Sequence, residues 1–196
     1  MITHDFTQDE YLEFGRARIG PLLDYFCLQL HAALSCHAGK NVFFCTRAGI
    51  RIALSLKKWL LKTNTSPAYS INILPTSRFA SLRACIDDSE EGISFIQEAL
   101  INTSQSHGPI AFSRFFGIST DQLPSDSEYK SFVDIYRLLK NSSELLPAIN
   151  LLMESKECLR ETLTRNSPDK DIVIVDSGWA GTTQLFLEKA FSDCRF

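Results

Sequence analysis

The segment that most constrains the fold of this chain is DIVIVDSGWAGTTQLFLEKAF, which runs from Asp171 to Phe191. Apolar β-forming residues lead into an acidic residue, a turn with two glycines and then a helical pattern from about Thr182. A buried strand that turns at once into a helix is the repeating unit of a parallel α/β sheet. The segment therefore predicts a strand at 172–175 and a ligand-binding turn after it, because ligands bind at the carboxyl ends of parallel strands.

Two earlier segments repeat this pattern of a strand followed by a helix. NVFFCT is a short apolar run, and RAGIRIALSLKKWLLK continues directly from it with helical periodicity. YSINILPTSR offers another strand that ends near Pro75, because proline has no N–H for a central ladder. A right-handed crossover makes this strand parallel to the first. The predicted fold class is therefore α/β, with a parallel sheet of three strands.

Helical segments flank and interrupt this predicted sheet. Apolar residues from about 8 to 38 recur at helical spacing, with Gly20 and Pro21 as the expected break between two helices and Gly39 as the expected C-cap. A large helical insertion without strands is expected next, with helices near 90–102, 109–116, 126–140 and 143–164. The predicted organisation is N-terminal helices at 1–40, an α/β core at 41–86 and 167–196, and the insertion at 87–166. Three strands make a small sheet, so we expect the chain to be the leading part of a longer protein with further domains.

Composition and charge exclude several classes of function. Twenty Lys and Arg against 23 Asp and Glu give a net charge of −3, which offers no global basic field for nucleic acid. The N-terminus lacks the order of a signal peptide, and no apolar run approaches the roughly 18 residues of a membrane helix. Six cysteines without a CxxC pair, and four histidines without HxxxH or HExxH spacing, predict reduced core cysteines and no structural zinc site. We expect a cytoplasmic protein with no nucleic-acid partner and no membrane span.

The loops after the three predicted strands carry residues suited to a phosphorylated ligand. A helix N-terminus offers unpaired N–H groups and a partial positive charge, and glycine lets a phosphate approach them. Arginine side chains from neighbouring loops would add charge-assisted hydrogen bonds. Asp176, at the end of its strand, could accept from ribose hydroxyls or hold Mg²⁺. The candidate binding residues are Arg47, Ala48, Gly49, Arg78, Gly178, Trp179, Ala180, Gly181, Thr182 and Thr183.

Each candidate also has a structural interpretation. Gly49 and Gly181 can be required by backbone geometry alone, Arg47 can pair with Asp176, and Trp179 can be a packing residue. The chain lacks GxxxxGK[ST], which excludes a P-loop NTPase, and lacks GxGxxG after its first strand, which argues against a dinucleotide enzyme. VIVDSGWAGT is similar to the hhhhDxDGT opening of haloacid-dehalogenase phosphatases, but a glycine replaces the second aspartate, the general acid.

The order of these motifs resembles that of the type I phosphoribosyltransferases. The resemblance implies a parallel sheet of phosphoribosyltransferase-like type, with the loop from Arg47 to Gly49 and the side chain of Arg78 on pyrophosphate. It also implies a ribose 5-phosphate loop made of Asp176 and residues 178–183, with Asp176 and Arg47 as catalytic residues and Mg²⁺ as cofactor. Ser177 stands where that family has its second acidic residue.

A second resemblance covers nearly the whole chain. The segments EFGRARIGPLLDYF, NVFFCTRAGI, ILPTSRFA, FSRFFGIS and VDSGWAGTTQ resemble an uncharacterised region of large bacterial proteins described as haloacid-dehalogenase-superfamily hydrolases. Those proteins often accompany glycosyltransferase and surface-polysaccharide genes, which implies a role in that metabolism. The corresponding motifs of those proteins usually read FLARDG and SRRA. They have an aspartate in place of Ala48 and an arginine in place of Phe79.

The sequence therefore predicts a phosphoribosyltransferase-like domain that binds a phosphorylated sugar or nucleotide. Two alternatives stay open: a domain associated with a haloacid-dehalogenase-type phosphohydrolase, and a non-catalytic regulatory or scaffold module with a degenerate pocket. The expected partner is a phosphorylated small molecule, and a homodimer is one option for the oligomeric state.

The first prediction concerns Arg47→Ala. If this side chain binds the anion, the substitution should cost about 1.5–3 kcal/mol of binding free energy and leave the melting temperature almost unchanged. Isothermal titration calorimetry with phosphoribosyl pyrophosphate and a thermal melt measure the two quantities. A large drop in melting temperature with unchanged ligand affinity would assign Arg47 a structural role instead.

Overall fold

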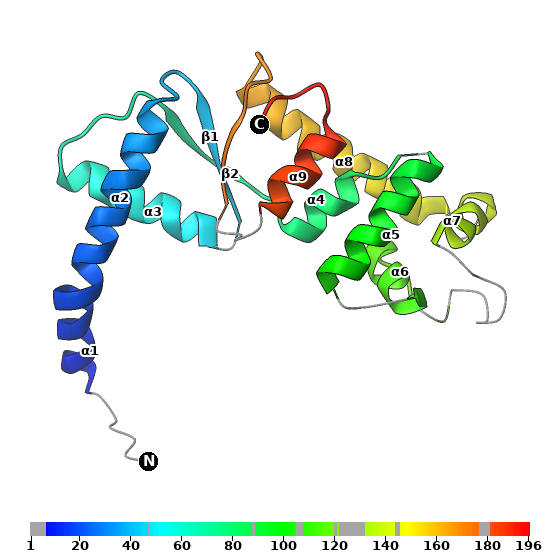
Figure 1. Ribbon diagram of the computed structural model, residues 1–196, viewed down its shortest axis with the longest axis horizontal. Helices are drawn as coiled ribbons and strands as arrows, with labels where there is room; N and C mark the ends of the chain where they lie inside the picture. Colours follow the sequence, from blue (N-terminus) through cyan, green and yellow to red (C-terminus); the bar gives the residue numbers. More distant parts are fainter. Residues whose placement is uncertain are drawn as a thin grey trace. The chain divides into compact units, whose positions relative to one another are not determined.

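The computed structural model describes residues 7–46, 48–87, 89–104, 108–119, 121, 132–143, 146–176 and 181–196. The chain divides into two compact units, and Figure 1 labels most of their helices and strands. The first unit is Met1–Ile73 with Val173–Ser177, and the second is Leu74–Ile172 with Gly178–Phe196.

A three-stranded parallel sheet is the centre of the first unit. Its order is β2-β1-β3, with β1 at Asn41–Cys45, β2 at Ser70–Leu74 and β3 at Val173–Val175. In the pairing of β1 with β3, Val42 lies opposite Val173 and Phe44 opposite Val175. Residues 42–45 of β1 are all buried, as expected for a central strand that is apolar on both faces. The predicted α/β class and the predicted parallel sheet are confirmed.

Helix α3 (Ala48–Lys62) follows β1 and covers it. Its buried side chains join Val42 and Phe44 in one apolar cluster. A Cβ at Gly49 would lie 3.2 Å from the carbonyl carbon of Phe44, so the start of the helix approaches the strand more closely than a larger residue permits. The buried residues that the helix contributes to this cluster are Ala53, Leu56 and Leu60.

The long N-terminal helix differs from the predicted pair of helices. Helix α1 (Gln8–Phe14), the π-helix η1 (Gly15–Ile19) and α2 (Gly20–Ser35) follow one another without a break. Gly20 is right-handed helical, and its N–H bonds the carbonyl of Gly15, five residues back. The predicted break at Gly20 and Pro21 is therefore wrong. Proline is tolerated in the first turn of a helix. Pro21 is in the first turn of α2, directly after the wider π turn, so its missing N–H does not interrupt the helix.

The end of the long helix also differs from the prediction. Helix α2 ends at Ser35 and its C-cap is Cys36, so the expected C-cap role of Gly39 is wrong. Gly39 instead has φ +77° in the turn before β1, where its N–H donates to the carbonyl of Ala68 at 2.6 Å. The left-handed conformation that sequence attributed to Gly39 is present, but it serves the entry into the sheet.

Six helices make up most of the described residues of the second unit. The expected helices near 90–102, 109–116 and 143–164 are confirmed, and the described part of the helix expected at 126–140 forms α7, while 126–131 lies outside the described residues. Helix α4 was not predicted; it packs against α8 and α9 within this unit. The helices are α4 (Arg78–Ala84), α5 (Glu90–Ser104), α6 (Gly108–Phe116), α7 (Phe132–Asn141), α8 (Leu146–Asn166) and α9 (Thr182–Ala190).

Aromatic side chains form the centre of this helical unit. The ring of Phe112 lies 4.4 Å from the rings of both Phe116 and Phe132, between centroids. Phe115 lies 5.0 Å from Phe116, and Tyr136 extends the group along α7. Phe112 and Phe115 are fully buried, so helices α6 and α7 depend on this cluster for their packing.

The second prediction compares two residues of α6. Phe112→Ala should lower the free energy of unfolding by about 3–5 kcal/mol, because it leaves a cavity among buried rings. Ile110→Ala, on the same helix but 54% exposed, should change it by less than about 0.5 kcal/mol. Urea denaturation followed by circular dichroism measures both. Equal effects of the two substitutions would show that the aromatic cluster does not stabilise this unit.

Candidate functional site

In the first unit, the predicted site residues lie at the carboxyl edge of the sheet. Strands β1 and β3 are adjacent and parallel, so Cys45 and Val175 end at the same edge and Asp176 follows directly. Ala48 is half-buried as the first residue of α3. Gly49 is buried against Phe44, which supports a packing role for this glycine rather than contact with a ligand. Arg47 lies outside the described residues.

Two acidic groups meet at this edge. Burial and, to a smaller extent, the carboxylate of Asp176 together raise the pKa of the Cys45 thiol from its ordinary value of 9.0 to about 12. A thiol with such a pKa is protonated at neutral pH, so Cys45 is not an activated nucleophile. The half-buried carboxylate of Asp176 is the charged group that this edge offers for hydroxyls or for a cation.

In the second unit, the predicted phosphate turn leads into α9. Gly181 is the N-cap with φ +61°, and among the described residues no side chain caps this helix. The first helical bond is from the Leu185 N–H to the Gly181 carbonyl at 3.1 Å, so the N–H groups of residues 182–184 precede the intrahelical ladder. Thr182 is half-buried, whereas Thr183 is only 4% exposed. The expected hydroxyl donor is therefore Thr182 rather than Thr183.

The remaining residues of that turn, Ser177, Gly178, Trp179 and Ala180, lie outside the described residues. The structure adds a second reason for glycine at position 181. A Cβ there would meet nothing within 4 Å, so space does not require glycine; the left-handed φ favours glycine over most other residues.

Arg78 is the first residue of α4, and its side chain is exposed. The hydroxyl of Ser77 caps this short helix by accepting from the N–H of Ala80 at 3.2 Å. The start of α4 is thus already satisfied by its own N-cap residue. Convergence of Arg78 and Arg47 on one anion stays a prediction.

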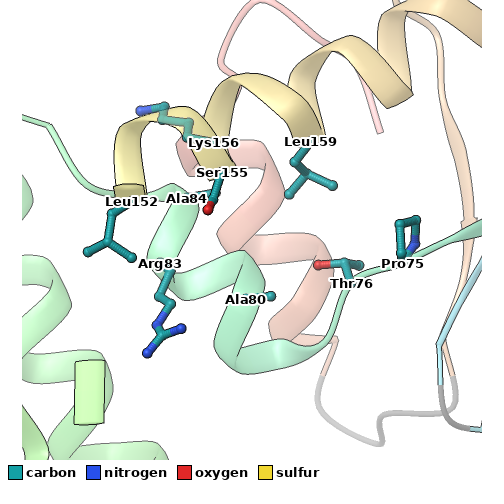
Figure 2. Close-up of a pocket in the computed structure, with 9 residues that line it drawn as sticks. All are labelled: Pro75, Thr76, Ala80, Arg83, Ala84, Leu152, Ser155, Lys156 and Leu159. Atoms are coloured by element: carbon teal, nitrogen blue, oxygen red, sulfur yellow. The ribbon is translucent and has the colours of Figure 1, made fainter. Parts of the chain in front are cut away.

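A cavity of about 200 Å³ lies between α4 and α8 in the second unit (Figure 2). The lining includes two cations that sequence analysis did not place in a site, Arg83 and Lys156. Lys156 donates from Nζ to the carbonyl of Ile86 at 2.9 Å, and Arg83 donates from Nη2 to the carbonyl of Arg114 at 2.6 Å. The complete lining is Pro75, Thr76, Ala80, Arg83, Ala84, Leu152, Ser155, Lys156 and Leu159.

The two cations of this cavity do not converge. Figure 2 shows the ammonium group of Lys156 and the guanidinium group of Arg83 on opposite sides of Ser155. Each bonds a carbonyl at or just beyond a helix C-terminus, where a cation is favourable. They therefore serve helix packing, and the cavity between them does not have the geometry of an anion site.

Arg83 is nevertheless held in an unusual environment. Its guanidinium lies 4.7 Å above the ring of Phe79, and burial lowers the pKa of Arg83. Its Nε is buried and has no hydrogen-bond partner within the described part of the chain. Arg83 is half-buried, whereas Arg78, on the same helix, is exposed. No local signal pointed to Lys156, because it reaches Ile86 from a helix 70 residues further along the chain.

A second cavity of about 300 Å³ borders the beginning of α9. Its walls come from α5 and α9, where Phe95 meets Phe186 edge to face at 6.1 Å between centroids. Thr182 is part of this lining, so the first turn of α9 faces a hollow with apolar walls and a few polar groups. The lining residues are Phe95, Glu98, Ala99, Asn102, Thr182, Leu185 and Phe186.

The comparisons with known proteins add no assignment. No protein-family model, curated protein or solved structure matches the chain. Within the described ranges, no helix is long and apolar enough to cross a membrane. In the same part of the chain, no group of three or more His, Cys, Asp or Glu side chains could hold a metal ion. All six cysteines are free; Cys27, Cys45 and Cys85 are buried, whereas Cys36 and Cys158 are exposed.

The third prediction concerns the pair of acidic groups at the sheet edge. Asp176→Asn should lower the pKa of Cys45, because a negative charge is removed, but burial should keep this pKa above 9.0. NMR titration of protein labelled with ¹³C-cysteine measures this pKa. Because the pKa is raised on folding, this thiol's contribution to stability should be full below pH 9.0 and fall as the pH rises towards about 12.

Asp193→Asn provides the matched control. Burial raises the pKa of Cys194, and the neighbouring Asp193 carboxylate raises it further, so this substitution should act on Cys194 and leave Cys45 unchanged. A Cys45 titration that Asp176→Asn does not alter would contradict the placement of this carboxylate beside the thiol.

Proposed function

We propose that the chain binds a phosphorylated sugar or nucleotide in the manner of a phosphoribosyltransferase-like domain. The observation that carries this proposal is the beginning of α9, where Gly181 is left-handed and no side chain of the described residues caps the helix. The N–H groups of Thr182 and Thr183 precede the first intrahelical bond and suit a phosphate. In this proposal the phosphate occupies that position.

Asp176 supplies the second part of the proposal. It follows β3 at the carboxyl edge of a parallel sheet, where α/β proteins bind their ligands. We assign its carboxylate to sugar hydroxyls or to Mg²⁺, because one protein carboxylate together with ligand phosphates is a common way to hold this ion. Arg47 and Arg78, as candidate anion contacts, belong to the same proposal.

The hollow beside Thr182 supports a ligand larger than free phosphate. Its volume of about 300 Å³ falls at the lower end of small-molecule pockets. The walls of this cavity are mainly apolar, but Glu98 and Asn102 also line it. Such a lining suits a sugar or a base, because these groups have both apolar faces and hydrogen-bonding groups. A phosphorylated sugar or nucleotide is therefore preferred over inorganic phosphate.

The chain is proposed first of all to bind such a ligand. The resemblances to the two families suggest an activity in addition, transfer of a phosphoribosyl group in bacterial surface-polysaccharide metabolism. Asp176 and Arg47 are the proposed catalytic residues. Ser177 stands where the phosphoribosyltransferases have an acidic residue, and Ala48 stands where the haloacid-dehalogenase-type proteins have an aspartate. A chain that binds ligand without turning it over would therefore fit a non-catalytic regulatory module.

The fourth prediction tests the phosphate position with Gly181→Asp. Aspartate tolerates a left-handed conformation, and its carboxylate would cap α9, so the fold should keep or gain stability. The same carboxylate would occupy the place of the phosphate and repel it, so affinity should fall by at least about tenfold. Calorimetric titration with phosphoribosyl pyrophosphate, nucleoside monophosphates and nucleotide sugars, with and without Mg²⁺, measures the affinity.

Gly39→Asp is the control, since Gly39 also has a positive φ and open space around its Cβ position. It should leave the affinity unchanged. Asp176→Asn should weaken binding with Mg²⁺ more than binding without it. If the unmodified chain binds none of these compounds, or if Gly181→Asp binds as well as Gly39→Asp, the start of α9 is a structural connection and the proposal fails.

A further inference from the structure

The N-terminal helix of the first unit, formed by α1, η1 and α2, exposes a large group of apolar side chains. Neither α1 nor η1 has a buried residue, and α2 buries only Cys27 and Leu34. Figure 1 shows α1 at the end of this helix furthest from the sheet of its unit. The exposed apolar residues, with fractional exposures from 42% to 65%, are Tyr11, Leu12, Phe14, Ile19, Leu22, Leu23, Tyr25, Phe26 and Leu28.

We propose that this helix is an interface at which two copies of the chain associate. Monomeric proteins rarely expose contiguous apolar patches larger than a few hundred Å². The nine side chains together expose roughly 900 Å², as estimated from their fractional exposures and the area of large apolar residues. A standard interface buries about 800 Å² on each partner. The exposed area of all nine side chains is therefore of the same order as what each copy contributes to a stable dimer, and the part of it on one helical face enters the contact.

The order of the apolar residues fits pairing with an identical helix that runs in the opposite direction. A twofold axis between Arg18 and Ile19 places Tyr11 against Phe26 of the second copy. The same axis places Phe14 against Leu23, and Leu22 against Gly15, where the absence of a side chain leaves room for it. Apolar residues thus meet apolar residues on both sides of the axis, as an isologous interface requires.

One face of the helix can carry this contact. Tyr11, Gly15, Ile19, Leu22 and Phe26 recur at intervals of three and four residues, the spacing of a single helical face. A Cβ at Gly15 would meet nothing within 4 Å, so this face is open at its middle. A small residue there lets a second helix approach closely.

The charge of the helix argues for a second copy over an anionic lipid surface. Interfacial helices that bind such surfaces are rich in Lys and Arg on the polar face. Here Asp9, Glu10, Glu13 and Asp24 outnumber Arg16 and Arg18, so this helix has net negative charge. An anionic membrane would repel it. A second copy has the same net charge, but none of these acidic residues belongs to the face of Tyr11, Ile19 and Phe26, so two copies can bury that face against each other.

Sedimentation equilibrium of the full chain tests the inference. The unmodified chain should form dimers at micromolar concentrations, and Leu22→Glu should raise the dimer dissociation constant at least about tenfold, because it places a charge in the apolar contact. Leu151→Glu is the matched control, since Leu151 is 62% exposed on α8 and Leu22 is 65% exposed. The control should dimerise like the unmodified chain. A chain that stays monomeric, or two variants that behave alike, would overturn the proposal.

Disulfide cross-linking tests the direction of the pairing without an added charge. Ile19→Cys places two thiols beside the proposed twofold axis, so oxidation should give covalent dimers well above the background of the unmodified chain. Leu28→Cys has a similar exposure, 46% against 42%, but lies far from its own copy in the antiparallel pair and should not cross-link. Equal cross-linking at both positions would overturn the antiparallel arrangement. Monomers that bind vesicles of phosphatidylcholine and phosphatidylglycerol would assign the helix to a lipid surface instead.

Discussion

The parallel pairing of β1 with β3 is the constraint on which the first unit depends. It joins Val42 to Val173 across most of the length of the chain, so the long segment Leu74–Ile172 of the second unit intervenes in sequence between the two paired strands. Closing such a long loop costs chain entropy, and the fully buried side chains of Val42, Phe43 and Phe44 offset that cost through apolar burial. The same pairing brings Cys45 and Asp176 to one edge. The electrostatic contact between these two groups is thus a direct consequence of strand order.

Local signals in the sequence were sufficient for the strands and for most helices. NVFFC is an apolar run and SINIL alternates polar with apolar residues, and both form strands where they were expected. Strand order could not be predicted, because the position of β3 beside β1 depends on contacts between distant segments. Helix α4 was missed because its seven residues are too few for a clear periodic pattern. The local signal of Gly20 and Pro21 was misleading, since a π-helical turn lets the helix continue through a proline.

The sequence could predict which residues belong to the candidate site but not how exposed each of their side chains is. Sequence identifies the residues that follow each strand, and parallel topology assigns Asp176 to the carboxyl edge. Whether a side chain there is available depends on packing that sequence does not show. Thr182 and Thr183 are neighbours with the same chemistry, yet Thr183 is buried, because α9 packs against α4 in the second unit. Gly49 and Gly181 were equivalent in the sequence; one is required by the approach of α3 to β1 and the other is favoured by a left-handed φ.

Helix α3 connects the two features of the first unit that carry the functional arguments. Its beginning lies at the sheet edge, where Gly49 packs on Phe44. Further along, Leu56 and Leu60 share an apolar cluster with Cys27 and Leu34 of α2. The ion pair between Lys62 and Asp24, 3.1 Å apart, is exposed on both sides and adds little to this packing. The orientation of the N-terminal helix is therefore fixed by the same apolar core that covers β1. A substitution in that core would disturb the sheet edge and the apolar helix together, whereas surface substitutions at either end leave the other intact.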